Sequence, residues 1–91
     1  METFRLLISG KVQGVFFRET SRKIAEKLNI TGWVKNTSDG EVEALITGEE
    51  KDLKEFVNFC KTGPQRAMVD KVKISKEEKI ITFKRFDVLR G

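Results

Sequence analysis

Residues 10–18 read Gly10-Lys11-Val12-Gln13-Gly14-Val15-Phe16-Phe17-Arg18, and this stretch decides how the first half of the chain folds. An apolar run over residues 4–8 leads into it, and a helix-like pattern follows it. The stretch therefore predicts a strand that passes through a glycine-flanked turn into the start of a helix. Such a turn can direct several backbone N–H groups at one point, where the helix N-terminus adds a partial positive charge. Arg18 places a planar cation beside that point, so we expect an anion-binding loop that suits a phosphoryl group.

The remaining sequence supplies further strands and a second helix. Besides the strand at residues 4–8, alternating apolar residues predict strands over residues 31–36, 41–47, 69–75 and 80–89, the last with a possible break near residues 84–85. Helical periodicity predicts helices over residues 18–28 and 50–61. This order predicts an α+β fold: a ferredoxin-like βαββαβ sandwich, with two helices on one face of a mainly antiparallel sheet and an extra C-terminal strand.

Two placements follow from the same periodicities. Cys60 falls on the apolar stripe of the second helix, which indicates a core residue rather than a nucleophile. Val72 and Ile74 are expected to point inward from the fourth strand.

Length and composition narrow the class of protein. The chain has 91 residues, which predicts a single domain over residues 1–91. No stretch is apolar enough to span a membrane, and its single cysteine, without a signal-peptide pattern, indicates the cytoplasm. The net charge of +4 favours anionic ligands, but the basic residues alternate with acidic ones as on an ordinary solvated surface. We expect a cytoplasmic monomer that binds neither nucleic acid nor membrane.

The chain contains no histidine. This absence removes the Ser-His and Cys-His nucleophile pairs and the usual imidazole general base. It also removes most familiar metal sites, so we expect no metal and no cofactor. Any catalysis must then come from positioning and electrostatics.

A second segment reads Gly32-Trp33-Val34-Lys35-Asn36-Thr37-Ser38-Asp39-Gly40-Glu41-Val42. Together with residues 10–18 it resembles the acylphosphatase family. In that family a G-x-V-Q-G-V-x-F-R loop and a G-W-V-x-N-x-x-x-G-x-V hairpin form one active site. The resemblance covers nearly the whole chain, and two such motifs at the right separation are a specific signal.

The resemblance implies an enzyme that hydrolyses small acyl phosphates, which are carboxyl-phosphate mixed anhydrides, to carboxylate and inorganic phosphate. Arg18 and Asn36 correspond to the catalytic residues: the arginine grips the phosphoryl group, and the asparagine orients the attacking water for in-line displacement. The implied phosphate-binding residues form one continuous segment: Gln13, Gly14, Val15, Phe16, Phe17 and Arg18. Ser21 stands where animal members carry threonine, so a local hydrogen-bonding role for its hydroxyl is retained.

The two residues implied to be catalytic also have simpler explanations. Arg18 could form a surface ion pair with Glu19 or Glu26, and Asn36 could serve only its turn. The chain end leaves two alternatives open. If the last strand runs parallel to the first, the Gly91 carboxylate could reach Arg18 and orient its guanidinium; otherwise the C-terminus is frayed.

Three other functions fit parts of the pattern. An RNA-recognition domain shares the element order, but residues 41–47 carry two acids and no aromatic residue. Similar domains begin larger hydrogenase-maturation proteins that handle carbamoyl phosphate, although this chain has no cysteine-rich extension and is expected to be freestanding. A non-catalytic phosphate binder is the third alternative, and a turnover assay separates it from an enzyme.

Overall fold

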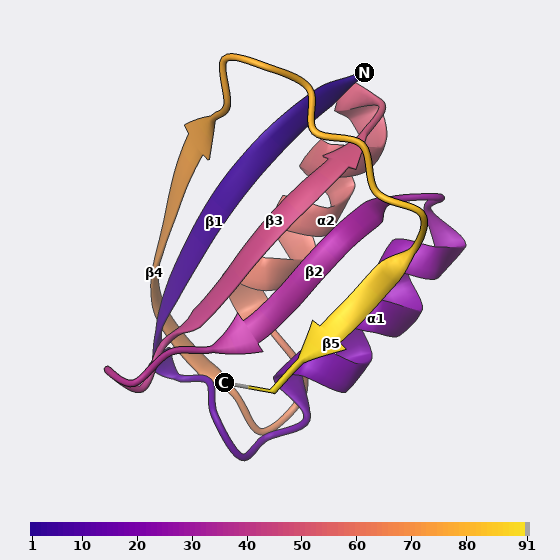
Figure 1. The fold of residues 1–91 in the computed structure, drawn as a ribbon. Coiled ribbons are helices and arrows are strands. Elements are labelled where there is room, and N and C mark those ends of the chain that lie inside the picture. Colours follow the sequence, from indigo (N-terminus) through magenta and orange to yellow (C-terminus); the bar gives the residue numbers. More distant parts are fainter. Residues whose placement is uncertain (91) are drawn as a thin grey trace.

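The predicted order of elements is confirmed in the computed structural model, which describes residues 1–90. Its strands and helices are, in chain order, β1 (Glu2–Lys11), α1 (Phe17–Lys27), β2 (Thr31–Asn36), β3 (Val42–Gly48), α2 (Glu50–Thr62), β4 (Met68–Lys76) and β5 (Phe86–Leu89). Both helices pack on one face of the sheet, as Figure 1 shows, which confirms the ferredoxin-like α+β fold. Neither helix of residues 1–90 has the length and apolar character needed to cross a membrane.

The five strands lie in the order β4-β1-β3-β2-β5. Neighbouring strands pair antiparallel except β2 and β5, which pair parallel. The central strand is β3, with β1 and β2 on either side, and most of the buried side chains of the sheet belong to β1 and β3. Because β5 lies beside β2, the C-terminal ends of these two strands meet at one edge of the sheet (Figure 1).

The core lies between the sheet and the helices. Alternate residues of β1 and β3 face the helices, and Leu6, Ile8 and Ile46 are fully buried there. From α2, Leu53, Phe56, Val57 and Cys60 pack against them. Each of the larger side chains contributes about 1.5–3 kcal/mol by leaving water.

Cys60 lies in this core, as predicted. Its side chain is fully buried, and burial raises the pKa of the thiol well above its usual range. Because the thiolate is the nucleophilic form, this residue is unsuited to covalent catalysis.

The strand predicted over residues 80–89 is wrong for its first part, because only Phe86–Leu89 pairs with the sheet. The preceding residues instead cross the ends of β1 and β3. There the Ile81 N–H donates to Thr3 Oγ1 at 2.9 Å, and Thr47 Oγ1 donates to the Ile81 carbonyl at 2.7 Å. The hydroxyls of Thr3 and Thr47 thus satisfy the backbone N–H and carbonyl of Ile81, which form no hydrogen bonds with a neighbouring strand.

The inward placement of Ile74 is also wrong in part. Ile74 pairs in register with the buried Leu6, so it does lie on the helix side of the sheet. However, β4 is an edge strand, and the side chain of Ile74 remains 47% exposed because the helices do not cover it.

Candidate active site

The anion-binding loop predicted at residues 10–18 lies between β1 and α1. Gly14 and Phe16 have positive φ angles of 74° and 64°, whereas φ of the intervening Val15 is not positive. Alternation of this kind turns successive backbone N–H groups toward one side of the chain. Since a left-handed φ is unfavourable for a residue with a side chain, the conformation of Phe16 is held by its surroundings.

The backbone donors of this loop are unpaired. Within residues 1–90, no backbone N–H from Gln13 to Glu19 donates a hydrogen bond to a carbonyl or a side chain. The ladder of α1 begins only with Thr20, whose N–H donates to the Phe16 carbonyl at 3.0 Å. The loop and first helical turn therefore offer a series of free donors at a helix N-terminus, where the helix dipole also favours an anion.

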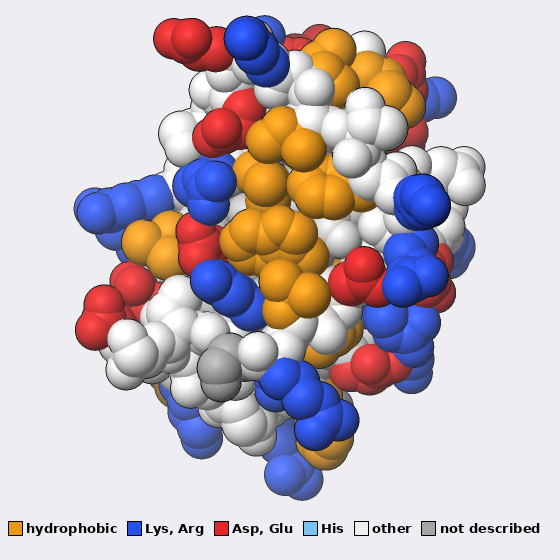
Figure 2. Space-filling view, in the orientation of Figure 1, with side chains coloured by type: hydrophobic (Ala, Val, Ile, Leu, Met, Phe, Trp, Pro, Cys, Tyr) orange, Lys and Arg blue, Asp and Glu red, His pale blue; other side chains and the backbone are white. Residues whose placement is uncertain are grey.

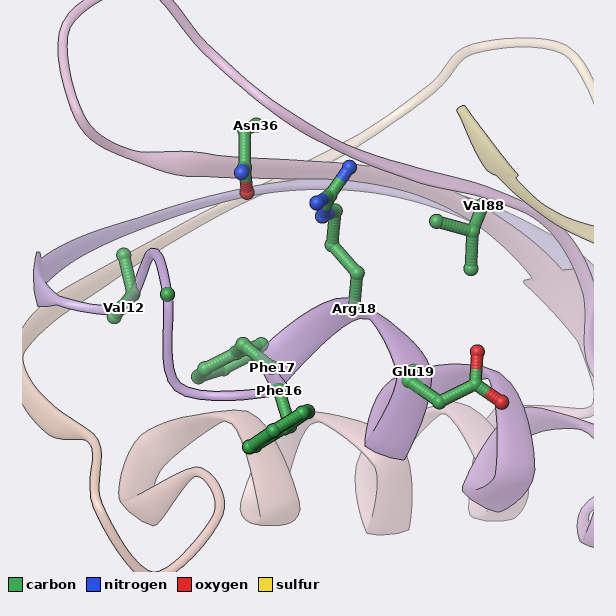
Figure 3. A pocket seen from close by; sticks show the side chains of 8 residues that line it. Val12, Phe16, Phe17, Arg18, Glu19, Asn36 and Val88 are labelled. Carbon is green, nitrogen blue, oxygen red and sulfur yellow. The ribbon is translucent and has the colours of Figure 1, made fainter. Parts of the chain in front are cut away.

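Arg18 and Asn36 meet beside this loop. Arg18 extends from the first turn of α1, and Asn36 is the last residue of β2. Both line a hollow of about 350 Å³, shown in Figure 3. The hollow is lined by Val12, Gly14, Phe16, Phe17, Arg18, Glu19, Asn36 and Val88.

The side-chain amide oxygen of Asn36, Oδ1, is buried and lacks a hydrogen-bond partner among residues 1–90. Asn36 lies two residues after the buried Val34, so the pleat of β2 directs its side chain to the helix side, toward the loop (Figure 3). A buried oxygen without a partner is costly unless a ligand or water pairs with it.

Arg18 is free of the surface ion pair that was one alternative. Arg22 binds both candidate acids instead: it donates to Glu26 at 3.0 Å and also pairs with Glu19. The hydrogen bond from Arg22 lowers the pKa of Glu19, which keeps this carboxylate ionised and bound to Arg22. Arg18 Nη1 donates to the Leu89 carbonyl at 3.3 Å, so the end of β5 holds the guanidinium.

The predicted contact between Arg18 and the Gly91 carboxylate falls on a residue outside the described part of the chain. Its premise holds, since β5 runs parallel to β2, and β2 and β1 both pair antiparallel with β3.

Two residues of the predicted phosphate-binding segment have other side-chain roles. Gln13 Nε2 donates to the carbonyls of Thr37 and Glu41, each at 2.9 Å, and so fastens the loop to the β2–β3 turn. Val15 packs in the core at 4% exposure. Neither side chain lines the hollow, so only their backbones are available to an anion.

Sequence reasoning missed three lining residues, Val12, Glu19 and Val88. Val88 had a usable signal, because alternation with Phe86 along the last strand places it on the helix side. Ser21 is buried and donates from Oγ to the Phe17 carbonyl at 2.7 Å, which agrees with the local role expected for its hydroxyl.

Free backbone donors, an arginine and an unpartnered amide oxygen thus lie together at one hollow of a ferredoxin-like α+β protein. The model of the acylphosphatase family matches residues 4–88. An acylphosphatase of Rubrobacter xylanophilus is 47% identical over 73 residues, which is 80% of this chain and 66% of that protein. The chain therefore belongs to the acylphosphatase family, and the family prediction is confirmed.

Solved structures agree with this assignment. The acylphosphatase of Bacillus subtilis superposes with a TM-score of 0.94 at 35% identity, covering 98% of this chain and 99% of that one. Full-length HypF, in a phosphate- and nucleotide-bound form, contains a similar part: TM-score 0.84 at 27% identity, over 97% of this chain but 12% of that one. The RNA-recognition alternative is thereby set aside, and the enzyme is a hydrolase acting on acyl phosphates.

The two hydrogen bonds from Gln13 to the β2–β3 turn, here called the Gln13 clamp, should affect both stability and phosphate binding. Gln13→Ala removes two hydrogen bonds, so the free energy of unfolding should fall by about 1–3 kcal/mol. Phosphate should also bind more weakly, because the loop loses its attachment to the β2–β3 turn. Denaturant unfolding and inhibition by phosphate measure the two effects. Gln65→Ala, at an exposed position, is the control, and unchanged phosphate inhibition in folded Gln13→Ala would contradict the role.

Proposed function

We propose that this enzyme hydrolyses acyl phosphates by in-line attack of a water held by Asn36 on a phosphoryl group held by Arg18 and the backbone of residues 13–18. Two observations support the proposal together: Asn36 Oδ1 is buried without a hydrogen-bond partner among residues 1–90, and Asn36 lines the same hollow as Arg18. We further propose that the chain acts as one domain over residues 1–91, as a cytoplasmic monomer.

The binding step needs donors for three phosphoryl oxygens. The unpaired N–H groups that follow Gln13 supply several, and none has to break an internal hydrogen bond before it binds. The Arg18 guanidinium supplies two more donors in one plane and a fixed positive charge. As the bond to the leaving carboxylate lengthens, these donors stabilise the negative charge on the phosphoryl oxygens.

The attack needs a water in line with the departing carboxylate. Asn36 Oδ1 can accept a hydrogen bond from such a water, which satisfies the buried oxygen and directs a lone pair of the water at phosphorus. With no histidine in the chain, the proton of the water passes to a phosphoryl oxygen of the substrate. The leaving carboxylate is a weak base and needs no proton, so these groups suffice without a covalent nucleophile.

One assay tests the function itself. Benzoyl phosphate should be hydrolysed at a rate above its spontaneous decay, because the proposed site holds all the groups that the reaction requires. Exhaustive treatment with a chelator should leave the rate unchanged. Loss of turnover on chelation, restored by Mg²⁺ or Zn²⁺, would contradict the mechanism as written.

The two proposed catalytic residues should fail in different ways. Arg18→Gln and Asn36→Ala should each lower kcat by on the order of 10²–10⁴ while the fold persists. Phosphate should inhibit Arg18→Gln only weakly but Asn36→Ala almost as well as the parent, since Asn36 acts on the water alone. Arg18→Lys should not restore turnover, because an ammonium cannot make a planar pair of contacts.

Matched controls are available in the same chain. Arg85→Gln and Asn58→Ala change the same residue types at exposed positions away from the hollow. Circular dichroism should show all variants folded. If folded Asn36→Ala keeps near-parental turnover, Asn36 does not position the water and serves only the structure of the turn that follows β2.

A further inference from the structure

Glu19 is the one acidic residue, among residues 1–90, that lines the hollow of Arg18 and Asn36. A second hollow of about 480 Å³ adjoins the first at Arg18, Asn36 and Val88, and no acid of the described residues lines it. Glu19 is the third residue of α1, so it lies in the first helical turn, next to the loop. A negative charge there can compete with a phosphoryl group for the same hydrogen-bond donors.

A glutamate at the third position of a helix has a known alternative contact. From there its side chain can reach back to the backbone N–H of the residue that precedes the helix, as in a capping box. In α1 that residue is Phe16, whose N–H belongs to the loop and donates no hydrogen bond within residues 1–90. A carboxylate bound to this N–H would occupy one of the donors that an anion in the loop needs.

The structure shows Glu19 bound to Arg22 instead, one turn further along α1. Arg22 Nε donates to Glu19 Oε2 at 3.4 Å, and Arg22 Nη2 donates to Oε1, so both carboxylate oxygens have a partner. The N-terminus of α1 accordingly has no side-chain cap. Figure 3 shows the Glu19 carboxylate directed away from Phe16.

Arg22 is itself held from its other side. Its Nη1 donates to both carboxylate oxygens of Glu26, at 3.1 and 3.0 Å. Acidic and basic side chains are interleaved along the side of the molecule where α1 lies, as Figure 2 shows. The guanidinium is therefore fixed between two carboxylates of its own helix, in an orientation that keeps Glu19 bound to it.

We propose that Arg22 is a positioning residue, which holds the Glu19 carboxylate off the Phe16 N–H and so keeps the loop open to the phosphoryl group. Without Arg22, Glu19 turns back onto the loop and competes with the phosphoryl group. The chain thus carries a latent self-inhibitory contact. This inference rests on the proposed function, because it takes the free donors of the loop as the phosphoryl site.

The test is a set of variants assayed with inorganic phosphate and benzoyl phosphate. Arg22→Gln should raise the inhibition constant of phosphate and KM by about three- to tenfold, the size of a side-chain cap, with kcat nearly unchanged. Glu19→Ala in the Arg22→Gln background should restore both values. If the ion pair were merely structural, the double variant would bind as weakly as the single one. Arg22→Lys should keep most of the parental affinity.

A second measurement separates a hydrogen bond from a general effect of charge. In phosphate-free ¹⁵N-labelled protein, the Phe16 amide resonance should move in Arg22→Gln, because the Glu19 carboxylate now accepts a hydrogen bond from it. The resonance should return in the double variant. A loss of affinity that disappears at high salt, while the Phe16 resonance stays in place, is an effect of charge alone and would overturn the inference.

Glu26→Gln is the matched control, because it breaks the other ion pair of Arg22 on the same helix and leaves the pair with Glu19. KM, phosphate inhibition and the Phe16 resonance should all stay as in the parent. If Arg22→Gln does not fold, Arg22→Ala gives the same comparison with the residue that most favours a helix. Equal phosphate binding in the parent and in the folded Arg22 variant would overturn the inference, whereas failure of the parent to bind phosphate at the loop would overturn the proposed function.

Discussion

The consecutive backbone N–H groups from Gln13 to Glu19 are kept out of internal hydrogen bonds within residues 1–90, and the rest of the site depends on that constraint. It requires positive φ at Gly14 and Phe16, and at Phe16 this conformation costs about 1–2 kcal/mol. The two hydrogen bonds from Gln13 to the β2–β3 turn, at about 0.5–1.5 kcal/mol each, are of the right size to offset that cost. The loop is thus held in this conformation by contacts within the protein itself.

The sheet order assembles the remaining parts around this loop. β2 and β5 are far apart in sequence but adjacent in the sheet, so Asn36 at the end of β2 lies near Val88 and Leu89 of β5. The Leu89 carbonyl then accepts a hydrogen bond from Arg18 and sets the position of the guanidinium. Three chain segments that are far apart in sequence therefore meet at one end of the sheet, where they line two adjoining hollows.

Much of this could be predicted from the sequence, because local rules and two motifs point the same way. Periodicity located the helices and most of the strands, and the motifs identified Arg18 and Asn36, which the structure brings into one hollow. The clamp made by Gln13 could not be predicted, since its partners are the backbone carbonyls of Thr37 and Glu41, which carry no side-chain signal. The segment before β5 was misread because alternation cannot tell a paired strand from an extended segment tied to Thr3 and Thr47.

Whether the free backbone donors of the loop bind the phosphoryl group can be measured by titrating ¹⁵N-labelled protein with inorganic phosphate and following the amide resonances. The largest saturable shifts should fall on the amides of residues 14–18, Arg18→Gln should weaken them, and Asn36→Ala should leave the phosphate affinity nearly unchanged. Shifts centred on the basic edge strand β4, or shifts on the loop that do not depend on Arg18, would contradict binding of the phosphoryl group by these donors.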